Sequence, residues 1–187
     1  MEIIHTGEQY YRLDVTDRDI RLMTIRLFDY SPIKEIKLDF LESELLKRFH
    51  NSGKYEVAEL GCYAVVGDPR IQSIPWKFYP NVPDNSNQKE LSEFKSNHVN
   101  QFGLWRFNKA IIDFKPHIVF DLRDYWMYAY QEISPLRKYF KWVIMPTVDS
   151  APQQIEWLYT FSNADMVIPY TEWAKYVLSE SCGHHIN

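Results

Sequence analysis

The chain has 187 residues, of which 45% are hydrophobic and 25% are charged, a balance typical of one soluble globular domain. A net charge of -4 and the lack of basic clusters argue against nucleic-acid binding, which usually needs a basic face. No apolar run approaches the roughly 20 residues that span a bilayer, no signal core opens the chain, and two cysteines make no disulfide framework, so a cytoplasmic location is predicted.

Residues 1–19 are polar and poorly periodic, and we interpret them as an N-terminal extension. Asp17 and Asp19 form the Asp-x-Asp pattern that holds a metal ion in some sugar transferases. Here the pattern precedes an apolar strand instead of following one. A structural role is therefore favoured, and no metal is expected.

The next segments predict a strand, a helix and a second strand. Residues 20–28 form an apolar run that favours a strand and ends at Asp29. From Ile33 to Phe49, apolar residues recur at helical spacing while charged residues take the other side, as in an amphipathic helix. Residues 55–60 alternate between apolar and polar and predict the second strand. This order indicates a right-handed βαβ unit.

Residues 67–90 are interrupted by prolines and predict an irregular loop. A loop of this length inside a compact domain is usually functional or mobile. Trp76 within it is expected either to stack on a ligand or to pack on the core, and packing is the favoured interpretation.

The second half of the chain repeats the alternation. The expected elements are a helix over 102–114, a strand over 118–120, a helical or irregular segment over 125–140, a strand over 142–145, a helix over 151–163, a strand over 165–170 and a helix over 172–180. Pro152 behind a serine cap begins one helix, and Thr171 caps the last. We therefore expect an α/β fold with a Rossmann-like, mostly parallel sheet flanked by helices.

The stretch from Lys115 to Trp126 is the most informative part of this pattern, because it contains a helix stop, a buried strand and a charged strand end. Pro116 stops the preceding helix, and the apolar run that follows is typical of a strand buried on both faces. The run ends abruptly in charged residues. Because open parallel sheets bind ligands beyond the carboxyl ends of their strands, this end is a candidate wall of a binding site. A strand end with merely solvated or paired charges is an equally good interpretation.

Three further strands are expected to end in polar clusters, and in a parallel sheet all four clusters share one edge. The candidate substrate-binding residues are Asp29, Tyr30, Arg123, Tyr125, Trp126, Asp149, Ser150, Tyr170 and Thr171. Together they suit a polyhydroxylated or phosphorylated ligand. The candidate catalytic residue is Asp124, which could accept a proton from an attacking hydroxyl. Arg123 could hold a phosphate or pair with Asp121 or Asp149.

Several known site patterns are absent. The glycines form neither a Gly-x-Gly-x-x-Gly motif nor a phosphate loop, and there is no Gly-x-Ser-x-Gly elbow. Cys182, His184 and His185 could hold zinc, but their spacing matches no standard site. A strand start or frayed tail is favoured there.

Five segments resemble the N-terminal half of a two-domain glycosyltransferase of the GT-B type, most closely the retaining group that includes glycogen synthases and mannosyltransferases. They are Phe102-Gly103, Lys115–Val119, Asp121–Met127, Met145–Ser150 and Ala164–Thr171. In that group, a Lys-Pro-Asp-Ile-Val segment leads into a strand whose end lines the acceptor cleft. A later segment leads into a helix near the domain junction.

The chain departs from this family at two places. The usual glycine-rich turn after the first strand is replaced by Asp29-Tyr30-Ser31-Pro32-Ile33, which puts donor phosphate contacts from that loop in doubt. The chain also ends at Asn187, about where the family's second domain begins. The expected organisation is an extension (1–19), an acceptor-binding domain (20–181) and the start of a linker (182–187) to a missing donor-binding domain. That domain is expected to dock near Trp173 and Tyr176.

The resemblance implies one half of an enzyme that transfers a sugar from a nucleotide-sugar donor to a hydroxyl acceptor, with no metal or other cofactor. The alternative is a non-catalytic Rossmann-like module that binds a ligand or a partner, because fold analogy alone does not separate the two.

Overall fold

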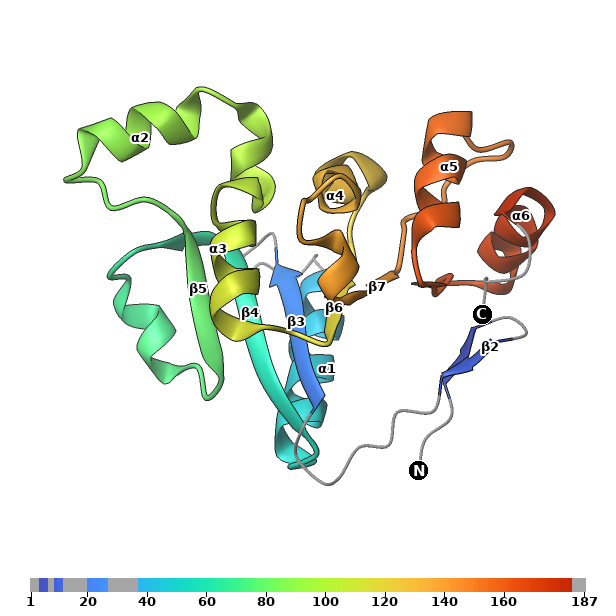
Figure 1. Cartoon of the computed structure of the whole chain (residues 1–187), viewed down its shortest axis with the longest axis horizontal. Coiled ribbons are helices and arrows are strands. Elements are labelled where there is room, and N and C mark those ends of the chain that lie inside the picture. Colours follow the sequence, from blue (N-terminus) through green and yellow to red (C-terminus); the bar gives the residue numbers. More distant parts are fainter. Residues whose placement is uncertain (1–3, 7–8, 12–19, 27–36, 183–187) are drawn as a thin grey trace.

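A computed structural model describes residues 4–6, 9–11, 20–26 and 37–182 and shows an α/β fold (Figure 1). Its sheet has the order β5-β4-β3-β6-β7-β8, and every neighbouring pair is parallel. The strands are β3 (Ile20–Arg26), β4 (Tyr55–Val65), β5 (Lys77–Val82), β6 (Ile118–Asp121), β7 (Lys141–Ile144) and β8 (Met166–Val167). A separate antiparallel pair joins β1 (Ile4–Thr6) to β2 (Gln9–Tyr11). The expected Rossmann-like sheet is confirmed.

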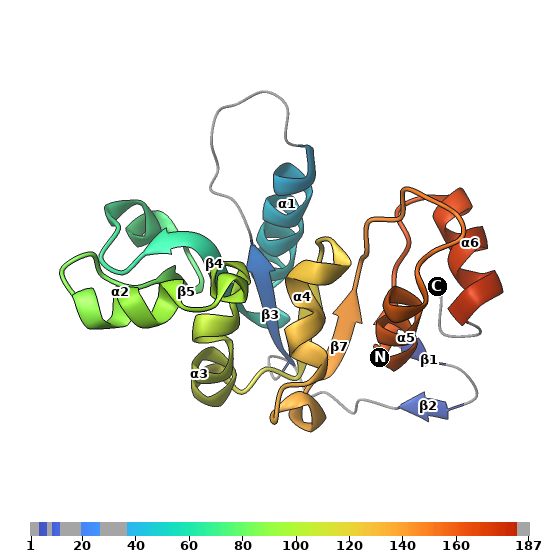
Figure 2. The ribbon, with the colours of Figure 1, turned by 90° about the horizontal axis from the view of Figure 1, so that it is seen from above.

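Helices cover both faces of the sheet. They are α1 (Lys37–Asn51), α2 (Gln88–Lys95), α3 (Leu104–Phe114), α4 (Tyr125–Glu132), α5 (Ile155–Asn163) and α6 (Glu172–Cys182), with short 3₁₀ helices at Pro69–Ser73, His98–Phe102 and Arg137–Tyr139. Seen from above, α1 lies on one side of β3, and α3 lies on the other (Figure 2). Helices α5 and α6 pack against each other at the β7–β8 end.

The central strand divides its side chains between two cores. Met23 and Ile25 lie in the larger core, together with Phe107 of α3 and Tyr128 of α4. Leu22 points the other way, into a smaller core on the α1 side. This follows from the two-residue period of a strand, which sends successive side chains to opposite faces. Each large apolar side chain that is fully buried stabilises the fold by about 1.5–3 kcal/mol.

The prediction of an irregular loop over residues 67–90 is wrong for much of that range. β5 pairs with β4 there, and α2 begins at Gln88. Pro80 is tolerated because β5 is an edge strand, where a missing N–H leaves no ladder bond unmade. Trp76 is half-buried, and its Nε1–H donates to the buried Glu59 carboxylate at 2.9 Å, while its packing on the core stays a prediction.

The helix starts differ from the prediction in one case and agree with it in another. The helix expected from 151 begins instead at Ile155, because Gln153 donates from Nε2 to the Ser150 carbonyl at 2.6 Å and holds the intervening residues in a turn. The cap expected at Thr171 is confirmed, since its Oγ1 accepts from the Ala174 N–H at 3.0 Å. The helix expected over 33–49 is described from Lys37 and runs to Asn51.

Candidate functional site

The predicted convergence of polar strand ends is present in the sheet. β6, β7 and β8 are adjacent and parallel, so the segments that follow them meet at one edge. These segments are 122–126, 145–153 and 168–171, and we call this region the carboxyl edge. Asp29 and Tyr30 belong to the segment after β3 and lie outside the described residues.

Arg123 and Asp121 form a buried ion pair beneath the carboxyl edge. Arg123 donates from Nε to Asp121 Oδ1 at 2.7 Å, and its Nη2 pairs with Oδ2. Burial would lower the pKa of Arg123, but the charge and hydrogen bonds of Asp121 outweigh it and hold that pKa well above its usual value. Of the alternatives open from sequence, the structure shows this pairing, which engages the guanidinium and so argues against its use as a phosphate ligand.

The ion pair is held by a second layer of buried polar groups. Gln131 donates from Nε2 to Asp121 at 2.5 Å and accepts from the Trp142 indole N–H at 2.7 Å. Arg123 also donates from Nη1 to the Phe102 carbonyl at 2.8 Å. Gln131 was not among the residues expected from sequence, because a single glutamine inside an aromatic helix carries no pattern that marks it as buried.

Asp124 stands at the first position before α4. Its backbone is extended (φ -68°, ψ 147°), and its side chain makes no capping hydrogen bond. The side chain is half-buried. A helix N-terminus favours an anionic side chain even without such a bond. The carboxylate therefore stays at the carboxyl edge without capping α4 or joining the Arg123 pair.

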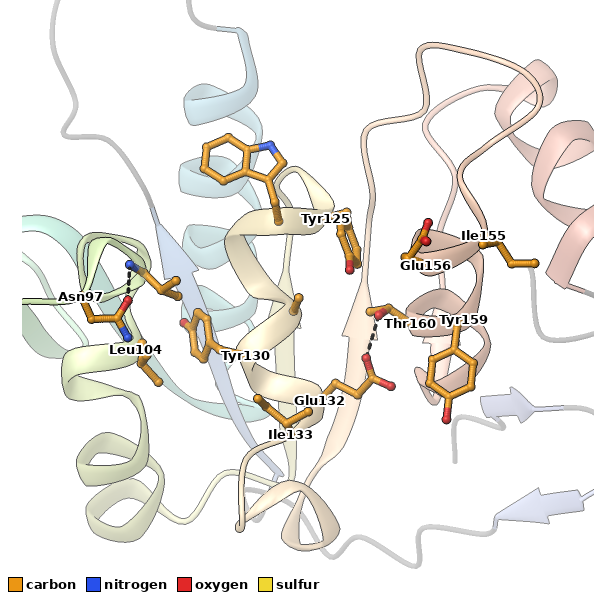
Figure 3. Close-up of a pocket in the computed structure, with 13 residues that line it drawn as sticks. Asn97, Leu104, Tyr125, Tyr130, Glu132, Ile133, Ile155, Glu156, Tyr159 and Thr160 are labelled. Carbon is orange, nitrogen blue, oxygen red and sulfur yellow. Dashed lines mark hydrogen bonds between the residues drawn. The ribbon is translucent and has the colours of Figure 1, made fainter.

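Two aromatic residues extend this edge along α4. Tyr125 stacks on Trp157 with ring centroids 5.5 Å apart, whereas Trp126 is 50% exposed and meets Phe102 edge-on at 4.8 Å. Both line a groove of about 740 Å³ that runs over α4 (Figure 3). In Figure 3, Leu104 borders α4 on one side, with Glu156 and Thr160 of α5 on the other. Thr160 donates to Glu132 at 2.7 Å and ties α4 to α5.

The other candidate residues occupy the same edge in different ways. Asp149 and Ser150 are exposed in the loop after β7. Tyr170 packs on the smaller core. The hydroxyl oxygen of Thr171 accepts the hydrogen bond that caps α6. The structure therefore brings five candidate residues together at one edge: Asp124, Tyr125, Trp126, Asp149 and Ser150. Thr171 has a structural role, because its hydroxyl already caps α6.

Sequence reasoning did not select Tyr128, which is the fourth residue of α4. Tyr128 is fully buried, and its ring meets Trp142 edge-on at 6.0 Å. Burial raises the pKa of Tyr128 well above its usual value, and the nearby Asp121 charge raises it further. The hydroxyl therefore keeps its proton at neutral pH. Because Asp124 precedes α4 with an extended backbone, helical spacing does not link the two residues, and no sequence pattern marks Tyr128.

The charge of the carboxyl edge is acidic. In the carboxyl edge (122–126, 145–153 and 168–171) the one cationic side chain is Arg123, and it is paired with Asp121 beneath the edge. The carboxylates of the edge are Asp124 and Asp149. A phosphate would meet the carboxylates of Asp124 and Asp149, with no unpaired positive charge in these segments to offset them, while sugar hydroxyls can donate to the same carboxylates.

Within 4–6, 9–11, 20–26 and 37–182, no three His, Cys, Asp or Glu side chains are grouped to hold a metal ion. Asp17, Asp19, His184 and His185 lie outside these residues, so the expectation of no metal stays a prediction. Across the same part of the chain, no helix is both long and apolar enough to cross a membrane.

The fold and the edge define a class: a Rossmann-like domain that matches half of a GT-B-like fold. Two solved structures are similar to it. UDP-GlcNAc 2-epimerase from Methanocaldococcus jannaschii has a TM-score of 0.55 at 15% identity, covering 90% of this chain and 45% of that chain. A putative UDP-N-acetylglucosamine 2-epimerase from Listeria monocytogenes has a TM-score of 0.52 at 17% identity, covering 89% and 43%.

At this identity the likeness shows the fold, and the chain spans less than half the length of either structure. No family model matches the sequence. No curated protein matches it either. The finer resemblance to glycogen synthases and mannosyltransferases finds no specific support in these two structures and stays a prediction.

Proposed function

We propose that the chain is one half of an enzyme that acts on a nucleotide sugar, and that its carboxyl edge binds the hydroxyl-bearing part of the substrates. The acidic charge of that edge carries the proposal, because carboxylates accept hydrogen bonds from sugar hydroxyls and repel phosphates. The GT-B-like fold supports it at the level of architecture. A second domain would then hold the nucleotide phosphates, as helix N-termini and basic side chains do.

The reaction we favour is transfer of the sugar to a hydroxyl acceptor. Asp124 is the proposed base, since its half-buried carboxylate makes no capping bond and stands beside the exposed Trp126 ring. The carboxylate would take the proton from the attacking hydroxyl, and the aromatic side chain would shield the sugar from water. Exposed Trp173 and Tyr176 on α6 offer a surface for the second domain.

The first prediction concerns Asp124→Asn, which keeps the shape and removes the charge. We expect UDP-GlcNAc to bind the variant about tenfold more weakly, because hydrogen bonds to a charged group contribute about 1.5–3 kcal/mol. In the enzyme with its second domain, turnover should fall on the order of a hundredfold. Titration calorimetry and a coupled assay for UDP release measure the two effects.

The matched control is Asp113→Asn, which removes the same charge from the end of α3, where Asp113 pairs with Lys77 at 2.6 Å. Its affinity for UDP-GlcNAc should match that of the wild type. Unchanged affinity and turnover in Asp124→Asn, with unchanged thermal stability, would contradict the role of Asp124.

A second candidate reaction is epimerisation of a nucleotide sugar. It is favoured by the observation that both similar structures are UDP-GlcNAc 2-epimerases. The two reactions separate in one experiment with the assembled enzyme and UDP-GlcNAc. Sugar transfer needs an acceptor for catalysis, whereas epimerisation inverts carbon 2 without one. Binding of the nucleotide sugar without either product would instead favour a non-catalytic binding module.

A further inference from the structure

Two polar atoms beneath the carboxyl edge are buried and have no hydrogen-bond partner among the described residues. They are Oη of Tyr128 and Oε1 of Gln153. Tyr128 is 0% exposed and Gln153 is 5% exposed. More than about nine in ten buried polar groups in proteins have a partner, and leaving one without costs about 1–3 kcal/mol.

Both atoms belong to segments that follow neighbouring strands. Tyr128 projects from α4, where side chains lean toward the helix N-terminus and so toward Asp124. Its surroundings include the charges of Asp121, Arg123 and Asp124 and the side chain of Tyr170. Gln153 lies in the loop after β7, and its Nε2 donates to Ser150, to the carbonyl at 2.6 Å and to Oγ at 3.2 Å. The amide is thereby oriented, and Oε1 is left as a free acceptor.

We infer that Tyr128 and Gln153 contact the ligand of the carboxyl edge and select for its sugar hydroxyl groups. This inference rests on the proposed function. The Tyr128 hydroxyl donates to a sugar oxygen, and Gln153 Oε1 accepts from a sugar hydroxyl, beside the Asp124 carboxylate. A ligand that lacks these hydroxyls leaves buried polar atoms unpaired and is rejected for that reason. A phosphate meets two acceptors, Asp124 and Gln153, and is disfavoured.

The test compares Tyr128→Phe with Tyr130→Phe in binding to UDP-GlcNAc, since Tyr130→Phe keeps the ring that lines the groove and removes only the hydroxyl. The Tyr130 hydroxyl donates to the Phe102 carbonyl at 3.0 Å and so has an internal partner. We expect the dissociation constant to rise roughly threefold to tenfold in Tyr128→Phe and to stay near the wild-type value in Tyr130→Phe. Thermal unfolding should show the opposite order, because Tyr130→Phe leaves the Phe102 carbonyl with one donor fewer and Tyr128→Phe removes an unpaired hydroxyl.

Each other outcome is decisive. Unchanged affinity in Tyr128→Phe would overturn the inference and leave the proposed function standing, since the hydroxyl would then take no part in binding. Failure of the wild-type chain to bind UDP-GlcNAc would overturn both. A large loss of stability in Tyr128→Phe would reveal a structural partner and remove Tyr128 from the site. Gln153→Met tests the second residue, and affinity equal to that of the wild type in a folded variant would remove Gln153.

Discussion

Arg123 shows how one buried side chain positions an exposed surface. Its guanidinium joins Asp121 on β6 to the Phe102 carbonyl before α3. Phe102 in turn meets the exposed Trp126 ring at 4.8 Å. Arg123 therefore acts on the carboxyl edge through Phe102 and Trp126. Because its planar fork can satisfy a carboxylate and a carbonyl at once, a lysine could not reproduce this arrangement.

A second prediction at the residue scale concerns Gly61, where the backbone of β4 lies close to the Phe78 ring of β5. A Cβ at this position of β4 would lie 2.2 Å from the Phe78 ring on β5. Gly61→Ala should therefore displace that ring and lower the free energy of unfolding by about 1–3 kcal/mol. Urea denaturation of the purified chain measures the loss.

The control is the same substitution in a Phe78→Ala background, where the ring is gone. There, Gly61→Ala should cost much less, because the clash has been removed. An equal loss in both backgrounds would show that close approach of the ring is not the reason for glycine.

At the scale of elements, Asp165 holds three segments together next to β7 and β8. Its carboxylate accepts from Arg137 at 2.8 Å, from Lys141 at 2.9 Å and from the Trp142 backbone N–H at 2.8 Å. It thereby joins the 3₁₀ helix at Arg137–Tyr139, the start of β7 and the segment before β8. Burial raises the pKa of Asp165, but these three donors outweigh it and hold that pKa below its usual value.

A lowered pKa in the folded state means that Asp165 stabilises the fold above the unfolded pKa of about 4 and loses this effect as pH falls through the folded value. Asp165→Asn should lower the unfolding free energy by about 1–3 kcal/mol at pH 7. The difference from the wild type should shrink as the pH falls from about 5 toward 2. Urea titrations across this range measure it, and a difference that does not vary with pH would exclude the charge as its cause.

The whole chain matches less than half the length of the solved structures that it resembles. If a second domain holds the nucleotide phosphates, as we propose, residues 1–187 alone should bind a nucleotide sugar weakly and should not turn it over. Product analysis after long incubation with UDP-GlcNAc, with and without sugar acceptors, measures this. Robust transfer, epimerisation or donor hydrolysis would show that the catalytic site is complete within this chain.

The sequence by itself determined most of the alternation of helices and strands, the ends of β6 and β7 to within one residue, and the Thr171 cap. These features depend on local patterns: a two-residue period in strands, a 3.6-residue period in helices, and a hydroxyl three residues before the N–H that it accepts from. The convergence of the polar strand ends followed from them, because parallel strands share one edge.

Only the tertiary structure decided which partners those residues meet. Arg123 had more than one possible carboxylate, and the structure shows that it pairs with Asp121 while its Nη1 donates to the Phe102 carbonyl. β5 was hidden in a segment rich in proline, because an edge strand is stabilised by pairing with β4 and not by its own sequence pattern. Tyr128 and Gln153 became candidates through burial without a hydrogen-bond partner, a property of the atoms around a residue that no spacing along the chain encodes.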